Sequence, residues 1–206
     1  MTGARHLVAI ALAVSTTACI HYTGHARSID PATVVATDGW VRVHGTPTVR
    51  QTGLTDCGPA ALAMVAGRWN VALDLAHAKV EAPVSSRLGV RLDVLRKVAR
   101  AHGLTAFAIA GDLAILEHEV RADRPVIVGL LRPYGKSGAL SHYEVVIALR
   151  PAARADDTLV VTIDPGAATG AGWQVRRWID LDTEWQPAGR PALVVLGPTA
   201  NLAAAP

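Results

Sequence analysis

One stretch of the sequence decides the fold: Gln51-Thr52-Gly53-Leu54-Thr55-Asp56-Cys57-Gly58-Pro59-Ala60-Ala61-Leu62-Ala63-Met64-Val65. Pro59 fits the first turn of a helix, and residues 60–64 are strong helix formers. A thiol at a helix N-terminus lies at the positive end of the helix dipole, which lowers its pKa and favours the nucleophilic thiolate. The stretch therefore predicts a reactive Cys57. The alternative is a small buried hydrophobic residue, the usual role of a free cysteine.

Gln51 lies just upstream of Cys57, on the loop that leads into the predicted helix. Its side-chain amide could donate a hydrogen bond to a developing oxyanion, together with the backbone N–H of Cys57. We therefore regard Gln51 as a candidate oxyanion donor.

The composition is that of one domain with flanking segments. The chain has 206 residues, half of them hydrophobic, with a formal net charge of +3. Lysines and arginines are scattered, so the sequence predicts no nucleic-acid partner. The glycine-rich segment 166–172 lacks the lysine of a phosphate-binding loop, and we expect neither a cofactor nor a metal.

Residues 1–18 are typical of an export signal, because a short basic start precedes the apolar run 7–14. The segment Thr16-Thr17-Ala18-Cys19 resembles a bacterial lipoprotein box, which predicts a lipidated Cys19 as the first mature residue. Cleavage after Ala18 by an ordinary signal peptidase is the alternative. We expect an exported protein of the bacterial cell envelope, anchored to the membrane through Cys19 and facing the periplasm, or otherwise periplasmic or secreted.

The remaining chain divides into a linker, a domain and a tail. Residues 19–45 show no helical period and predict a linker with one strand at 40–43. The domain is expected over residues 46–197 and a disordered tail over 198–206. Helices come first and strands second, which predicts the α+β class. Periodicity predicts helices over 57–68, 73–80, 91–102 and 112–121, and strands over 105–110, 126–131, 143–149, 159–163, 173–177 and 192–196.

A thiol nucleophile needs a base, and the base needs a group that fixes its tautomer. Among eight histidines, His142 alone is expected to begin a strand directly after a Gly- and Ser-containing loop. Asp164 closes the next predicted strand, before Pro165 and Gly166. If these strands are antiparallel neighbours, His142 and Asp164 lie side by side. Taken alone, Asp164 would be a turn residue.

These three stretches together resemble the bacteriocin-leader-processing (double-glycine) peptidases, a papain-like cysteine peptidase family. The matching features are Gln51 to Leu62, the block His142 to Ile147, and Asp164-Pro165, in the order Cys, His, Asp. The resemblance covers residues 46–197. It implies a papain-like fold, with N-terminal helices packed on an antiparallel sheet.

The resemblance also implies an activity. Cys57 would be the nucleophile, His142 the base, Asp164 the orienting carboxylate and Gln51 the oxyanion donor. The substrate would be a peptide or protein, cut after a small residue such as glycine. Familiar members carry a transporter and an ATP-binding domain, for which this chain shows no motif, so we expect a stand-alone exported relative. Two alternatives stay open: an exported peptidoglycan amidase or endopeptidase, and an inactive peptidase-like binding module.

Overall fold

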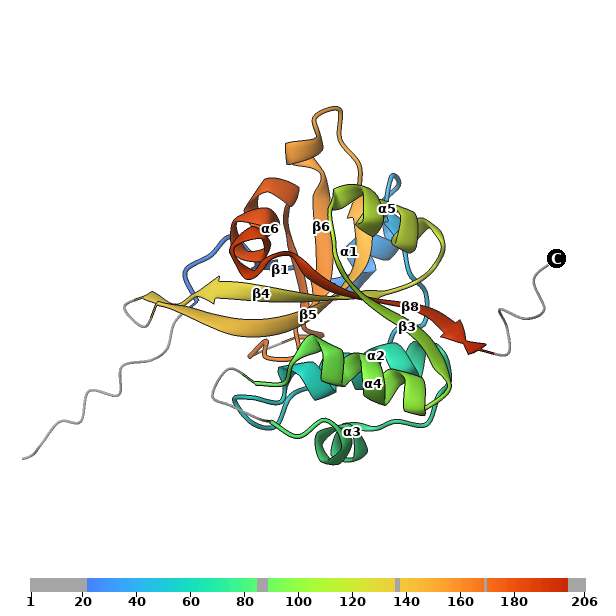
Figure 1. Ribbon diagram of the computed structural model, residues 1–206. Helices are drawn as coiled ribbons and strands as arrows, with labels where there is room; N and C mark the ends of the chain where they lie inside the picture. Colours follow the sequence, from blue (N-terminus) through green and yellow to red (C-terminus); the bar gives the residue numbers. More distant parts are fainter. Residues whose placement is uncertain (1–21, 85–88, 136–137, 169, 200–206) are drawn as a thin grey trace, which may run out of the picture.

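An eight-stranded antiparallel sheet forms the centre of the computed structural model (Figure 1). The structure describes residues 22–199, apart from 85–88, 136–137 and 169. The strands run in the order β1-β7-β6-β5-β4-β8-β3, and β2 pairs with β5. Their bounds are β1 Arg27–Ser28, β2 Val41–Arg42, β3 Leu104–Ala110, β4 Val126–Pro133, β5 Ala139–Arg150, β6 Leu159–Ile163, β7 Trp173–Arg177 and β8 Pro191–Pro198.

Helices cover both faces of this sheet. In Figure 1, α2, α3 and α4 lie below the sheet, whereas α5 and α6 lie above it. The helices are α1 Pro31–Ala36, α2 Cys57–Arg68, α3 Leu75–Glu81, α4 Leu92–Ala101, α5 Leu113–Arg121 and α6 Trp178–Trp185. Of the helices in the described part of the chain, none is long and apolar enough to cross a membrane.

The strands are apolar on both faces, and alternate residues supply two separate cores. On β4, Ile127 joins the core under α2 and α4, whereas Val126 and Val128 join the core under α5 and α6. On β5, Val145 and Val146 divide in the same way. This double coverage explains the long β-branched runs of the sequence. The same alternation decides which face of the sheet the residues just before and after each run occupy.

Helix α2 is the most deeply buried helix that the sequence predicted. Ten of its twelve residues are buried, from Cys57 to Ala66. Alanines and Gly58 allow this helix to approach the sheet closely, and a Cβ at Gly58 would lie 3.2 Å from the Tyr143 ring on β5. The cysteine is therefore held against the strand that carries His142.

The predicted helices and strands of the domain are present with small shifts at their ends. Two residues mark helix ends: Asp112 accepts a hydrogen bond from the N–H of Ile115 at the start of α5, and Gly103 follows α4 with a φ of +77°. Strand β5 begins at Ala139, so His142 lies inside a strand and not at its first residue.

The prediction of a linker is wrong for residues 22–45. β1 pairs with β7, and Val34 of α1 is fully buried in the core of α2. The strand predicted at 40–43 is present as β2, which pairs with β5. This segment lacks periodicity because its contacts are made far along the chain. Helix α6, which lies between β7 and β8 along the chain, was not predicted. Strand β8 runs to Pro198, one residue past the predicted domain end. The predicted signal peptide, Cys19 and the tail from 200 lie outside the described residues.

Candidate active site

Cys57 is the first residue of α2 and is buried, with 5% of its surface exposed. Burial raises the pKa of the thiol. A hydrogen bond and the charge of His142, together with the N–H groups of Tyr143 and Gly58, outweigh that effect and hold the pKa of Cys57 below its ordinary value. The surroundings of this thiol therefore favour the thiolate.

His142 connects the thiol to a carboxylate. Its Nε2 lies 2.7 Å from Oδ1 of Asp164. His142 and the Cys57 thiol are also close enough for each to shift the pKa of the other. Burial lowers the pKa of His142, but the bonds to Asp164 and Cys57 prevail and raise it to about 9. A protonated imidazole beside a thiolate is the arrangement that cysteine peptidases use for nucleophilic attack.

Asp164 follows β6 directly, and the pairing Val145↔Ile163 places it beside β5, as the sequence predicted. Its Oδ1 accepts from His142 and from the N–H of Gly166, each at 2.7 Å. Burial raises the pKa of Asp164, but the bonds to His142 and the charge of Arg132 prevail and hold it well below the ordinary value. The carboxylate is therefore ionised at neutral pH.

Gln51 is fastened to the same corner of the site. Its backbone N–H donates to the carbonyl of Pro165 at 3.0 Å, and its Nε2 donates to the carbonyl of Gly53 at 2.9 Å. A side-chain amide has two N–H donors, so this bond leaves one for a ligand. A Cβ at Gly166 would lie 3.1 Å from Oε1 of Gln51 and 3.2 Å from the His142 ring. The absence of a side chain at Gly166 thus lets these groups approach one another.

A hollow of about 440 Å³ adjoins this corner. It is lined by Arg50, Gln51, residues 165–168 and Gly170. The hollow lies beside Gln51, and its lining residues include neither Cys57 nor His142.

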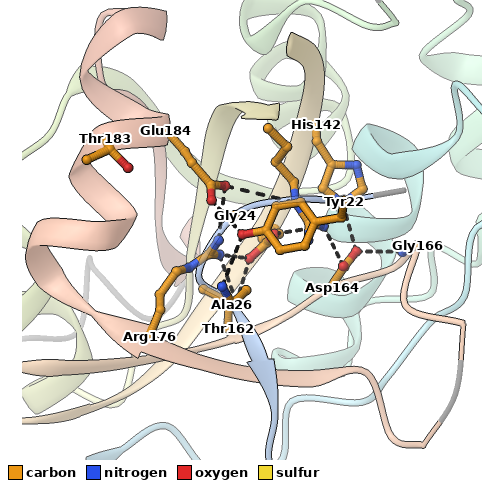
Figure 2. Close-up of polar contacts among 12 residues, drawn as sticks. Tyr22, Gly24, Ala26, His142, Thr162, Asp164, Gly166, Arg176, Thr183 and Glu184 are labelled. Carbon is orange, nitrogen blue, oxygen red and sulfur yellow. Dashed lines mark hydrogen bonds and ion pairs between the residues drawn. The ribbon is translucent and has the colours of Figure 1, made fainter. Parts of the chain in front are cut away.

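Behind Asp164 lies a buried network of charged groups that the sequence analysis missed (Figure 2). Arg132 of β4 donates to Oδ2 of Asp164 at 2.5 Å and lies 3.2 Å from Oε1 of Glu144. Glu144 also bonds to Arg176, which lies 3.1 Å from Glu184 of α6. The sequence contains one sign of this network, which is that charged residues lie inside or directly after apolar strands. Because such charges are buried only when they are paired, they indicate partners elsewhere in the chain.

Among the described residues, one group of potential metal ligands was found: His142, Glu144 and Asp164, whose ligand atoms lie within 4.8 Å of one another. The guanidinium of Arg132 forms ion pairs with both carboxylates, and His142 is bonded to Asp164. A cation therefore already balances these carboxylates, and the donor set does not fit a resident metal ion.

The fold and the buried cysteine and histidine define a papain-like cysteine peptidase. The chain belongs to the Peptidase C39 family, whose model matches residues 45–174. The predictions of the family, of the papain-like α+β fold and of a cysteine-type peptidase are confirmed.

Solved structures share this fold. The peptidase domain of Streptococcus ComA, a bi-functional ABC transporter, is 21% identical with a TM-score of 0.56, covering 74% of this chain and 98% of that chain. A double glycine motif protease from an AMS/PCAT transporter, solved with its leader peptide, is 22% identical at 0.55, covering 79% and 96%. A protein described as a C39-like peptidase from Bacillus anthracis is 16% identical at 0.60, covering 77% and 98%. None of the curated proteins matches the chain.

Proposed function

We propose that this peptidase hydrolyses peptide bonds through Cys57, His142 and Asp164, with Gln51 as an oxyanion donor. The observation that carries the proposal is the position of His142. Its ring is buried between the Cys57 thiol and the Asp164 carboxylate, and its Nε2 lies 2.7 Å from Oδ1 of Asp164. A histidine in a purely structural role needs only one of these partners.

The reaction follows from this arrangement. The Cys57 thiolate attacks the carbonyl carbon. The backbone N–H of Cys57 and a side-chain N–H of Gln51 hold the negative oxygen that forms. The His142 imidazolium gives its proton to the leaving amine as the C–N bond breaks. Water, deprotonated by His142, then attacks the thioester and releases the acyl group as a carboxylic acid. The sulfur leaves as the thiolate beside the reformed imidazolium, which restores the starting pair. Asp164 keeps the imidazole in the required tautomer throughout.

The preference for a small residue such as glycine before the cut is the next part of the proposal. A structural neighbour is a double glycine motif protease solved with its leader peptide. We expect part of the substrate chain to lie in the hollow beside Gln51 and Gly166. The substrate is a peptide or protein.

The location of the enzyme is proposed from the sequence. Export directed by residues 1–18 and lipid attachment at Cys19 would place the domain at the cell envelope. Mass spectrometry of the mature N-terminus tests this: an unmodified Met1 contradicts export, and a free Cys19 contradicts only the anchor.

A peptide library read by mass spectrometry tests the activity. We expect cleavage after small residues by the wild-type chain and none by Cys57→Ala. Cleavage that persists in the variant contradicts the mechanism, whereas cleavage mainly after large residues contradicts only the glycine preference. Release of fragments from peptidoglycan, without cleavage of any library peptide, would favour the amidase alternative.

A further inference from the structure

The two oxygens of the Asp164 carboxylate accept hydrogen bonds from different partners. Its Oδ1 serves His142 and the N–H of Gly166, whereas its Oδ2 accepts from Nη1 of Arg132 at 2.5 Å. Rotation of the carboxylate about its own axis would break the bond to Arg132 as well as the bond to His142. The plane of the carboxylate, and with it the direction offered to the imidazole, is therefore set by Arg132.

Arg132 is itself fixed on several sides. Its Nη1 also lies 3.2 Å from Oε1 of Glu144, a residue with no exposed surface. Its guanidinium lies over the ring of Tyr22, with 3.9 Å between the guanidinium carbon and the ring centroid. A guanidinium that is stacked and paired in this way has little freedom to leave Asp164.

The outer half of this support comes from parts of the chain outside the family match at 45–174. Tyr22 precedes β1, and its hydroxyl donates to Glu184 of α6 at 2.5 Å. The backbone N–H of Thr23 donates to the carbonyl of Pro133, the residue after Arg132. Figure 2 shows the Tyr22 ring lying between Glu184 and Asp164 in that view. The segment before the matched region thus closes over the network behind the site.

We propose that Arg132 is a positioning residue of this peptidase, which fixes the Asp164 carboxylate toward His142 and is itself held in place by Glu144 and the Tyr22 ring. The inference rests on the proposed function, because it assigns Arg132 a role through the Asp164–His142 pair. It also gives the N-terminal segment a part in forming the active site.

The charges around Arg132 indicate how its loss would act. The titratable and charged groups that face it come from six segments of the chain: Tyr22, Tyr134, Glu144, Asp164, Arg176 and Glu184. Removing Arg132 takes away both the charge and the donor that hold Asp164 ionised and oriented, while Glu144 keeps Arg176 as a partner. A less firmly held Asp164 stabilises the imidazolium less, so the Cys57 thiolate forms only at higher pH.

The test is the rate of Cys57 alkylation by iodoacetamide as a function of pH, read by mass spectrometry on the peptide that contains Cys57. This measurement needs no substrate. For Arg132→Gln we expect the midpoint of the curve to rise by about half a pH unit or more, which corresponds to about threefold slower alkylation at the low-pH end. Arg132→Lys keeps the charge, but an ammonium group cannot match the guanidinium fork, so its shift should be smaller and in the same direction. On a cleaved peptide, kcat should fall about tenfold to a hundredfold with KM unchanged.

Arg190→Lys is the matched control, because Arg190 forms a two-point ion pair with Asp182 away from the site. Its curve should coincide with the wild-type curve. Curves of both Arg132 variants that coincide with wild type, or an equal shift in the control, would overturn the inference. A wild-type curve with the midpoint of an ordinary thiol would instead contradict the proposed function.

Tyr22→Ala provides a milder route if the Arg132 variants lose their near-ultraviolet circular dichroism. It removes the stacked ring from the edge of the molecule and leaves every group of the proposed triad in place. We expect a smaller shift in the same direction, and an unshifted curve would count against the role of Arg132.

Discussion

Asp164→Asn replaces one carboxylate oxygen by an NH₂ group, and this change affects the hydrogen bonds to the partners of the carboxylate. If the new NH₂ group takes the place of Oδ1, it faces the N–H groups of His142 and Gly166, each at 2.7 Å. If it takes the place of Oδ2, it faces the donor of Arg132 at 2.5 Å. An amide therefore puts a donor against a donor in either orientation.

The size of the effect follows from these contacts. Removing one partner of a buried ion pair costs about 3 kcal/mol at the low end of the usual range. For a domain of this size, 1 kcal/mol corresponds to about 2–4 °C in Tm, so the variant should melt about 6–12 °C lower. An amide that turns its NH₂ group toward His142 holds the wrong tautomer, so kcat should fall by up to about 10⁴.

Thermal unfolding followed by circular dichroism gives the stability, and steady-state cleavage of a peptide cut by the wild-type chain gives kcat and KM. Asp182→Asn is the matched control: it also removes a carboxylate from an arginine, but near the surface, so its cost should be about 1 kcal/mol or less with unchanged kcat. A kcat for Asp164→Asn within a few-fold of wild type, or an unchanged Tm, would refute this reasoning.

Three further predictions concern the same chain. Activity should fall as the pH rises through about 9, because His142 then loses the proton that its partners hold above the ordinary pKa of 6.5. The same proton stabilises the fold fully below pH 6.5, and this stabilisation is lost as the pH rises through about 9. Activity that stays constant above pH 9 would contradict this prediction. Gly166→Val should lower kcat strongly, since a Cβ there already lies 3.1 to 3.3 Å from three groups of the site, whereas Ala153→Val at an exposed position outside the hollow should not; equal kcat values would argue against this crowding. Leu62→Ala should cost about 2–5 kcal/mol in urea unfolding because Leu62 is fully buried, and a loss below about 1 kcal/mol would show that α2 is less tightly packed than described.

Much of the architecture could be predicted because it is written in local patterns. The Cys57 helix, the capping role of Asp112 and the β-branched strands each depend on residues a few positions apart. The approach of His142 to Asp164 was predictable from one assumption, the antiparallel pairing of two successive strands, which the structure contains. Their catalytic roles are a separate matter, for the experiments above.

The missed features are those that depend on distant partners. Residues 22–45 have no apolar period, and their order comes from pairing with β7 and β5 more than a hundred residues away. Arg132 and Glu144 look like isolated charges at or inside apolar runs, and only the packed sheet brings them to each other and to Asp164. Periodicity reports which face a residue occupies, but it does not report which charge on that face will meet it.

The most direct test of the account is the titration of the Cys57 thiolate by its ultraviolet absorbance, in the wild-type chain and in His142→Ala. The wild-type thiolate should form below the ordinary thiol pKa of about 8.5, and the variant should titrate at or above that value because burial then acts without the imidazolium. A wild-type thiol that titrates at about 8.5 and does not respond to the loss of His142 would contradict the central claim that Cys57 and His142 form the reactive pair.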